Sequence, residues 1–224
     1  MAIQMAKRRF NVDEYHRMGD VGIFDEDSHM ELLDGVVWEM HPPTKHKYTV
    51  EEYNIMIERG VLLEDDPVEL IEGEIVEMSP IGIRHQACVD RLSDLLREYA
   101  NKSAIVRGQG PIQLPNHSQP QPDIALLRRR GDYYGKSLPI PADVFLVVEV
   151  AETSLRYDRN VKVPLYAKEG LHEAWLIDLK HDIIEVYTKP EKGKYQIMRQ
   201  AKRGETIVVE GVPGLALGVN DILG

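Results

Sequence analysis

The sequence predicts an α/β (α+β) fold in which a mixed β-sheet is flanked by helices. Three observations support this. Residues 144–148 (VFLVV) have the length and β-branched content of a strand buried on both faces. A predicted helix that ends near Gly170 and a second apolar strand at 174–179 follow it, which is the order of a strand-helix-strand crossover. Further short apolar segments reach residue 209, as expected for antiparallel strands.

The first 80 residues contain an internal repeat. Residues 9–43 align without gaps on residues 47–81 at an offset of about 38. Two copies are too few for a solenoid, and only the second continues into a larger domain. The first copy is therefore predicted to be an added module. Residues of the first copy that recur in the second include Val12, Glu14, Tyr15, Met18, Gly22, Glu31, Leu32, Gly35 and Met40, which become Val50, Glu52, Tyr53, Met56, Gly60, Glu69, Leu70, Gly73 and Met78.

Each copy is expected to form a short helix followed by a β-hairpin. Asn11 and Thr49 are predicted N-caps, and Glu14 and Glu52, three positions later, complete the signature of a capping box. An acidic loop follows, and then two short strands joined by Asp-Gly in the first copy and Glu-Gly in the second. The predicted unit is a helix-hairpin module that occurs twice.

The rest of the chain alternates helical and strand patterns. Apolar residues from Ala87 to Tyr99 recur at the spacing of one buried helical face. A C-cap at Gly170 suits the end of the helix in the crossover. The predicted strands cover residues 103–107, 111–114, 122–127, 144–150, 174–179, 183–187, 195–198 and 206–209.

Composition favours a globular protein. The 224 residues are 43% hydrophobic, enough for one large domain or for one domain with an appendage. No apolar run approaches the ~20 residues that span a bilayer, and the basic segment at residues 7–9 is not followed by the apolar stretch of a signal peptide. We therefore expect a cytoplasmic protein without membrane contact. The single cysteine, Cys88, excludes an intramolecular disulfide and a cysteine-based zinc cluster, and it falls among apolar helical positions.

Charge is unevenly distributed. The formal net charge of −10 argues against a nucleic-acid-binding surface over the whole molecule. Residues 1–80, however, contain 7 Lys and Arg against 19 Asp and Glu, a net charge of −12, whereas residues 81–224 have a net charge of +2. The N-terminal third should repel DNA. The run Arg128-Arg129-Arg130 either contacts phosphates or is a solvated loop.

Two carboxylates and an amine lie at or just beyond predicted strand ends. Asp123 begins one strand, Glu149 ends another, and Lys162 follows in the next helix. If the two strands are neighbours, the carboxylates can bind Mg²⁺, which takes oxygen ligands and keeps several waters. Tyr166 and Asp158 lie four positions on either side of Lys162, so all three would share a helical face. Proline is comfortable only in a first helical turn, so Pro164 requires the helix to start near Val161 or to kink.

The order Pro122-Asp123, then Glu149-Val150-Ala151, resembles the signature of the PD-(D/E)xK nuclease superfamily, with Ala151 at the position of the usual lysine. Residues 154–178 are similar to a bacterial branch, a family of "putative restriction endonucleases", in which the lysine has moved to the following helix. The resemblance covers about residues 47–224. It includes 69–73 (ELIEG), 78–80 (MSP) and His85.

The resemblance implies a restriction-endonuclease-like fold in residues 47–224, with residues 1–46 as the extra helix-hairpin copy. It implies Asp123 and Glu149 as ligands of Mg²⁺, for which Mn²⁺ can substitute, and Lys162 as the catalytic amine. Residues that could line the site are Glu69, His85, Asp158 and Tyr166, although a lone histidine opening a helix is also explained as a cap or a surface residue.

The expected function is that of a Mg²⁺-dependent DNA endonuclease, which hydrolyses a phosphodiester with a metal-activated water. Two alternatives remain open. One is a catalytically inactive nuclease fold that serves as a DNA-binding or assembly module, which the alanine at 151 and the acidic charge favour. The other is a metal-dependent hydrolase with another substrate, because a fold does not determine a substrate. A homodimer, formed through the acidic N-terminal module, is a further expectation.

Overall fold

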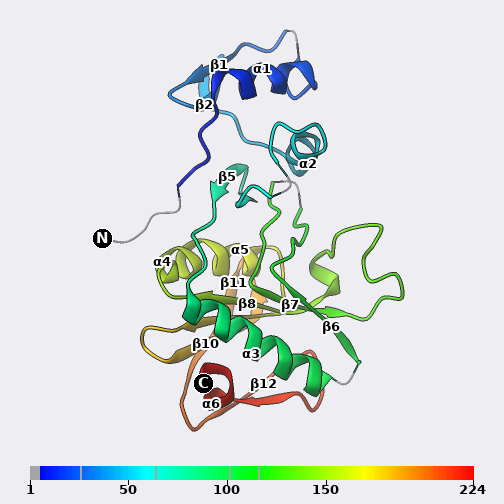
Figure 1. The fold of residues 1–224 in the computed structure, drawn as a ribbon, viewed down its shortest axis with the longest axis vertical. Helices are drawn as coiled ribbons and strands as arrows, with labels where there is room; N and C mark the ends of the chain where they lie inside the picture. The colour runs from blue at the N-terminus through cyan, green and yellow to red at the C-terminus, as the bar shows by residue number, and fades with distance from the viewer. Residues whose placement is uncertain (1–5, 26, 64, 101, 116) are drawn as a thin grey trace. The chain divides into compact units, whose positions relative to one another are not determined.

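The structure, a computed structural model, describes residues 6–25, 27–63, 65–100, 102–115 and 117–224, and it divides into two compact units (Figure 1). The sheet unit comprises Pro80–Gln113 and Gln121–Gly224, and the hairpin unit comprises Met5–Ser79 and Leu114–Pro120. Both predicted copies of the repeat thus belong to one unit, whose main boundary falls after residue 79. A functional division between residues 46 and 47 remains a prediction.

The sheet unit is built on one six-stranded mixed sheet, as predicted. The strand order is β11-β10-β9-β8-β7-β6, and of its neighbouring pairs β8 and β9 run parallel while the others are antiparallel. The parallel pair is the predicted crossover. Its strands are β6 (Ala104–Gly108), β7 (Ile124–Arg128), β8 (Val144–Ala151), β9 (Glu173–Asp178), β10 (Ile183–Glu191) and β11 (Lys194–Lys202).

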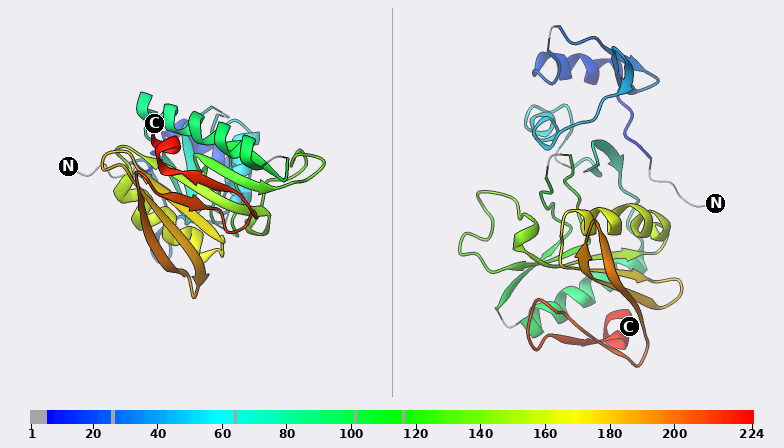
Figure 2. Two further views of the ribbon diagram at one scale, coloured as in Figure 1. Left: turned by 90° about the horizontal axis from the view of Figure 1, so that it is seen from below. Right: turned by 180° about the vertical axis from the view of Figure 1, so that it is seen from behind.

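Helices cover both faces of this sheet. Helix α3 (Ile83–Ala100) packs on one face, where its buried residues join the large hydrophobic cluster of β7, β8, β9 and β10. On the other face lies the helical segment formed by α4 (Leu155–Tyr157) and α5 (Val163–Lys168), and Val163 packs there with Ala151 and Leu176. The views in Figures 1 and 2 show α3 and α5 on opposite sides of the strands.

The helix after β8 accommodates its proline with a widened turn. It begins at Leu155, well before Pro164, and a π-helical turn spans Asp158–Lys162 between α4 and α5. The expectation that the helix could start near Val161 is therefore wrong. Proline has no N–H to donate, and its ring would clash with a carbonyl one regular turn earlier. A π-helical turn relieves that conflict, and such turns are frequent at functional sites.

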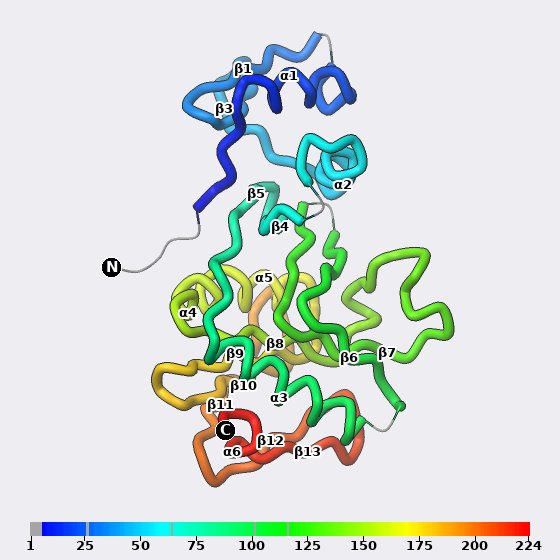
Figure 3. The backbone as a smooth tube through the Cα atoms, in the orientation of Figure 1, coloured from blue at the N-terminus to red at the C-terminus, as the bar shows by residue number. Residues whose placement is uncertain are grey.

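The C-terminal residues form a small layer against α3 (Figure 3). The predicted strand at 206–209 is β12 (Thr206–Val208), which pairs with β13 (Ala216–Gly218), and helix α6 (Val219–Leu223) follows. Carbonyl oxygens of α6 accept hydrogen bonds from Cys88 and Arg91 of α3. Cys88 is fully buried, as predicted.

The predicted strand at 111–114 is wrong. No strand covers these residues in the described part of the chain. Pro111 and Pro115 flank the segment, and Pro111 cannot donate to a ladder. The N–H of Gln113 instead donates to the carbonyl of Pro139, and that of Leu114 donates to Ser118 within a tight loop.

The hairpin unit contains a helix followed by a two-stranded hairpin twice, at an offset of 38 residues. Both predicted capping boxes are confirmed, at Asn11 with Glu14 and at Thr49 with Glu52. Both hairpin turns have positive φ angles, at Asp34-Gly35 and at Glu72-Gly73. The elements are α1 (Val12–Asp20), β1 (Met30–Leu33), β2 (Val36–Met40) and β3 (Pro43–Lys45), then α2 (Val50–Glu58), β4 (Val68–Ile71) and β5 (Glu74–Glu77). Among the residues that the structure describes, no helix is both long and apolar enough to cross a bilayer.

Candidate active site

Asp123 and Glu149 lie on adjacent strands. Ile124 is paired with Val148 in the antiparallel ladder of β7 and β8. Continuing this register by one residue places Asp123 opposite Glu149, which meets the condition set by the sequence. The carboxylate of Asp123 also contacts the second strand directly, because its Oδ2 accepts a 2.7 Å hydrogen bond from the backbone N–H of Val150.

His85 reaches the same carboxylate from the first turn of α3. Its Nε2 lies 3.1 Å from Oδ2 of Asp123, and the side chains of the two residues are only 13% and 16% exposed. Nδ1 of His85 is buried and has no hydrogen-bond partner among the described residues. A proton on Nε2, donated to Asp123, is therefore the arrangement that leaves no buried N–H unpaired in the neutral ring.

The pKa of His85 is nevertheless raised above its ordinary value. Burial is the largest single effect and lowers the pKa, but the hydrogen bond to Asp123 and the negative charges of Asp123, Asp158 and Glu152 together outweigh it. Three carboxylates thus act on one imidazole. The sequence left two explanations for His85, a helix cap or surface residue and a site residue. In the structure it lies within an acidic cluster at the end of β8.

Glu149 is held by the helical segment that follows β8. Its side chain and that of Lys162 are each 5% exposed, and Nζ of Lys162 lies 3.3 Å from both carboxylate oxygens. The hydroxyl of Tyr166 donates to Oε1 of the same carboxylate. A buried carboxylate needs a cation and hydrogen bonds to remain charged. Lys162 and Tyr166 supply both.

Asp158 lies in the same helical segment and faces the site. It is buried, and its Oδ2 accepts a 2.5 Å hydrogen bond from Oγ of Ser154, four residues earlier. Both Asp158 and Lys162 belong to the π-helical turn and both are buried. The widened turn thus directs one acid and one amine toward the end of β8.

Ala151 explains why the lysine comes from the helix. The residue at this position lies on the same face of β8 as Glu149 but is buried with Val163 and Leu176 in an apolar cluster. A longer side chain there would meet these apolar groups and its cross-strand neighbour in β9, Asp178. Lys162 instead approaches Glu149 from the helix that covers this face.

The donor set suits a hard cation. The described residues contain no group of three or more His, Cys, Asp and Glu arranged to hold a metal ion. Mg²⁺ does not require such a group, because one or two carboxylates can suffice when it keeps several waters. Within the described residues only Oδ2 of Asp123 is engaged, by Val150 and His85, which leaves its other oxygen available. Asp123 and Glu149 therefore fit a divalent cation by their chemistry.

Glu69 differs from the other candidate residues in the unit to which it belongs. Glu69 is fully buried in β4 of the hairpin unit, whereas the other candidates belong to the sheet unit. Three contributors were not anticipated. The backbone N–H of Val150 has no sequence signal, Ser154 could have been recognised by its four-residue spacing from Asp158, and Glu152 follows β8 directly.

Two further glutamates are buried in the sheet unit. Glu185 in β10 receives two hydrogen bonds from Arg159, at 3.0 and 2.9 Å, and one from Tyr187. Burial raises the pKa of Glu185, but the bonds from Arg159 and Tyr187 outweigh it and lower the pKa overall. Glu173 in β9 receives hydrogen bonds from two neutral donors, Trp175 Nε1 at 2.6 Å and the N–H of Glu210 at 2.8 Å, and burial raises its pKa to about 7.

The predicted basic run lies in an arginine-tyrosine loop after β7. Arg129 is exposed, donates to the Tyr133 hydroxyl at 2.8 Å and lies 5.3 Å from that ring's centroid. Arg107 of β6 donates to the carbonyl of Tyr133, so the loop folds back along the edge strand. Because Arg107 pairs with Ala125, this contact is near the end of the sheet where Asp123 lies. Exposed guanidinium groups with spare donors remain there.

Comparison with known proteins identifies the family and supports the fold. Residues 50–220 match the model of the Uma2 family, described as "Putative restriction endonuclease". The fold is similar to the crystal structure of a "putative nuclease belonging to DUF820" from Anabaena variabilis ATCC 29413, with a TM-score of 0.61 and 19% sequence identity over 79% of this chain and 97% of that one. No curated protein matches the sequence. The similarity to the solved structure supports the nuclease-like fold that the sequence predicted.

Proposed function

Because the chain belongs to the Uma2 family of putative restriction endonucleases, we propose that it is a Mg²⁺-dependent DNA endonuclease, with Mn²⁺ as a substitute ion. The observation that supports this best is the contact of Lys162 with Glu149, beside Asp123 on the neighbouring strand. Two carboxylates and an ammonium group at one end of a sheet are the groups that hydrolysis of a phosphodiester needs.

Asp123 and Glu149 would hold the ion through oxygens at the ends of neighbouring strands. When bound, such an ion lowers the pKa of a coordinated water and offsets charge on the phosphate. The N–H of Val150 donates a hydrogen bond to one oxygen of the Asp123 carboxylate and so fixes the orientation of this side chain. His85 of α3 contacts the same oxygen.

Lys162 has two roles in this proposal. It keeps the buried Glu149 ionised, and its ammonium group is placed to orient the attacking water or to stabilise negative charge on the phosphate. Tyr166 holds the other side of the Glu149 carboxylate. The amine therefore performs from the helix the role that the resemblance assigns to a lysine at position 151.

DNA is the proposed substrate. The sheet unit has a net charge near zero along its sequence, and the arginine-tyrosine loop gives it a local basic surface near the Asp123 end of the sheet. Phosphate oxygens are suitable acceptors for the exposed guanidinium group of Arg129.

The decisive experiment measures nicking of a supercoiled plasmid by the purified chain in Mg²⁺, with and without EDTA. Asp123→Asn and Lys162→Ala should abolish cleavage while circular dichroism shows a folded protein. The matched control is Asp178→Asn, since Asp178 ends the neighbouring strand β9 but is held by His181 at 2.7 Å. Full cleavage by a folded Asp123→Asn or Lys162→Ala variant would refute the proposal.

The inactive-fold alternative is favoured by one observation, the alanine at position 151. It predicts DNA binding without cleavage and no need for Asp123 to bind an ion. Isothermal titration calorimetry with Mg²⁺ or Mn²⁺ distinguishes the two functions. Binding that disappears in Asp123→Asn supports the endonuclease, whereas no detectable heat of binding with the wild-type chain supports the alternative.

A further inference from the structure

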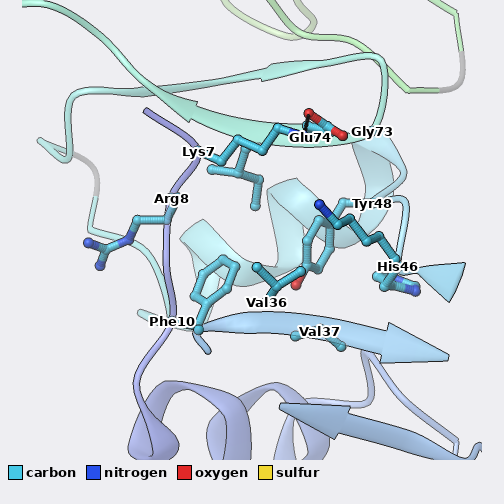
Figure 4. A pocket seen from close by; sticks show the side chains of 12 residues that line it. Lys7, Arg8, Phe10, Val36, Val37, His46, Tyr48, Gly73 and Glu74 are labelled. Atoms are coloured by element: carbon cyan, nitrogen blue, oxygen red, sulfur yellow. Dashed lines mark ion pairs between the residues drawn. The ribbon is translucent and has the colours of Figure 1, made fainter. Parts of the chain in front are cut away.

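A small pocket in the hairpin unit is lined equally by the two copies of the repeat. Figure 4 shows Phe10, Val36 and Tyr48 pointing into the same space. Its twelve lining residues form six pairs, and the members of every pair are 38 positions apart. The pairs are Lys7 and Lys45, Arg8 and His46, Phe10 and Tyr48, Gly35 and Gly73, Val36 and Glu74, and Val37 and Ile75.

The backbone hydrogen bonds around this pocket are reciprocal. The N–H of Arg8, before the first helix, donates to the carbonyl of Ile75 in the second hairpin at 2.8 Å. The N–H of His46, before the second helix, donates to the carbonyl of Val37 in the first hairpin at 2.9 Å. Exchanging the two copies converts one bond into the other. Such reciprocity defines a twofold relation, not a translation along a solenoid.

The strand pairing follows the same rule. Lys7 forms an antiparallel bridge with Val76, and Lys45 forms one with Trp38. The segment before each helix therefore bridges to the hairpin of the other copy. Its last residue bonds to the turn of its own hairpin, since the N–H of Phe10 donates to Gly35 and the N–H of Tyr48 donates to Gly73. The contacts between the two copies are reciprocal, as between the subunits of a symmetric dimer.

The two copies also share one hydrophobic core. Its buried side chains form a single cluster to which both copies contribute equivalent residues, such as Met18 and Met56, each fully buried. The rings of Phe10 and Tyr48 lie 5.9 Å apart in an edge-on contact. A copy of roughly 35 residues is below the size at which a chain of ordinary composition buries a stable core alone. Each copy therefore needs a partner.

We propose that the first copy is an internal partner: it occupies, within the same chain, the surface through which the second copy would otherwise pair with a second copy of this chain. Three observations converge on this assignment, namely the paired lining residues, the reciprocal bonds and the shared core. In addition, the family match begins at residue 50, so the first copy is an addition to the matched region. A partner tethered in the same chain has a high effective concentration and outcompetes a free one.

The first test traps the pairing in the full chain. Lys7 and Val76 form a bridge flanked by the bonds Arg8 to Ile75 and Glu77 to Ala6, which makes it a non-hydrogen-bonded pair. The Cα atoms of such a pair are ~4.5 Å apart, within disulfide range. Lys7→Cys/Val76→Cys should oxidise to a cross-linked monomer of 25.6 kDa. Lys45→Cys/Val76→Cys is the matched control and should not cross-link, because Lys45 pairs with Trp38.

The second test removes the internal partner's surface without shortening the chain. Phe10→Asp/Val37→Asp places charges on the first copy alone, so the second copy should expose its face and dimerise, as measured by light scattering after size exclusion. In that background Lys45→Cys/Val76→Cys should now cross-link between two chains. Adding Tyr48→Asp, which damages the second copy too, should restore the monomer.

Three outcomes overturn the proposal. One is a cross-linked dimer from Lys7→Cys/Val76→Cys in the otherwise natural chain. Another is a Phe10→Asp/Val37→Asp variant that stays monomeric, whether or not its first copy is released. The last is equal association after Tyr48→Asp is added, which would show non-specific contact. All readouts are masses and cross-links, so the result is independent of whether the chain cleaves DNA.

Discussion

The end of β8 and the start of β10 both bury a glutamate beside a cation from the same helical turn, yet they differ in the kind of cation that contacts the carboxylate and in what lies on the neighbouring strand. Glu185 in β10 is held by both arms of Arg159, by Tyr187 and by Gln200 at 3.4 Å. Glu149 in β8 is held by a lysine and a tyrosine. A second carboxylate lies on the strand beside Glu149 and has an oxygen to spare.

From this difference we infer which of the two buried acids belongs to the proposed site. A carboxylate that a bidentate arginine closes on all sides has a structural explanation. A carboxylate paired with a lysine next to another acid is the arrangement that the proposed ion site needs, and Lys is a point charge that can turn toward a phosphate. The predictions below test whether the two regions differ in this way.

The largest effect should come from neutralising each glutamate. Glu149→Gln should lower the rate of plasmid cleavage by about 10³-fold, because an amide neither holds a divalent ion well nor balances Lys162. Glu185→Gln should retain the rate within a few-fold. The measurement is the initial rate of plasmid cleavage at saturating Mg²⁺. Comparable losses of cleavage rate in both variants would remove the distinction between the two regions.

Removing each cation should affect stability next. Lys162→Met removes the ammonium group that contacts the buried Glu149 and should lower the free energy of unfolding by about 3 kcal/mol. Arg159→Met should cost less, about 1 kcal/mol, because the Arg159 side chain is 40% exposed and its pair is partly screened by water. Urea denaturation monitored by tryptophan fluorescence measures both.

The double variant Lys162→Met/Glu149→Gln serves as the control for this experiment. It removes both charges of the pair, so it should recover most of the lost stability without recovering cleavage. A double variant as unstable as Lys162→Met alone would show that packing, not the uncompensated carboxylate, accounts for the loss.

A third buried acid, Glu173, contacts no cation in the described part of the chain and should make stability depend on pH. Its folded pKa of about 7 lies above the ordinary value of 4.5. The folded state therefore holds the proton more tightly, so the contribution is complete below about pH 4.5 and is lost as pH rises through about 7. The loss should reach roughly 2 kcal/mol at pH 8 relative to Glu173→Gln, with the exposed Glu98→Gln as control. Parallel stability curves for wild type and Glu173→Gln would contradict this.

The smallest effect concerns exposed cations. Arg129→Ala should weaken binding of duplex DNA a few-fold in EDTA and reduce the slope of log affinity against log salt by about 1, as loss of one phosphate contact does. Arg97 on α3 is similarly exposed and pairs with Asp94. Arg97→Ala should leave affinity and slope unchanged in fluorescence anisotropy, and equal slopes for all three proteins would exclude Arg129 from the DNA surface.

Local patterns predicted most elements of this fold. The β-branched run of β8, the helical spacing in α3, the capping boxes at Asn11 and Thr49 and the Asp-Gly turn each depend on residues a few positions apart. The strand at 111–114 failed because its apolar pattern was outweighed by flanking prolines and by long-range backbone bonds. Helix α6 and β13 were missed because they are short and depend on α3 for burial.

The candidate site was predicted unequally. Asp123, Glu149 and Lys162 came from their order and from a family resemblance, and their roles remain predictions. The contact of His85 with Asp123 could not be derived from the sequence, since 38 positions separate the two residues and only the packing of α3 on the sheet brings them together. The bond from Val150 depends on strand register and leaves no trace in residue identity.

The sequence by itself determined the mixed sheet, the repeat and the identity of the two strand-end acids, because periodicity, turn chemistry and motif order are written within short segments. Only the tertiary structure decided that a π-helical turn brings Lys162 onto Glu149, and that each copy of the repeat pairs with the other's hairpin. Both depend on strand order, register and the burial of shared surface, which no local pattern specifies.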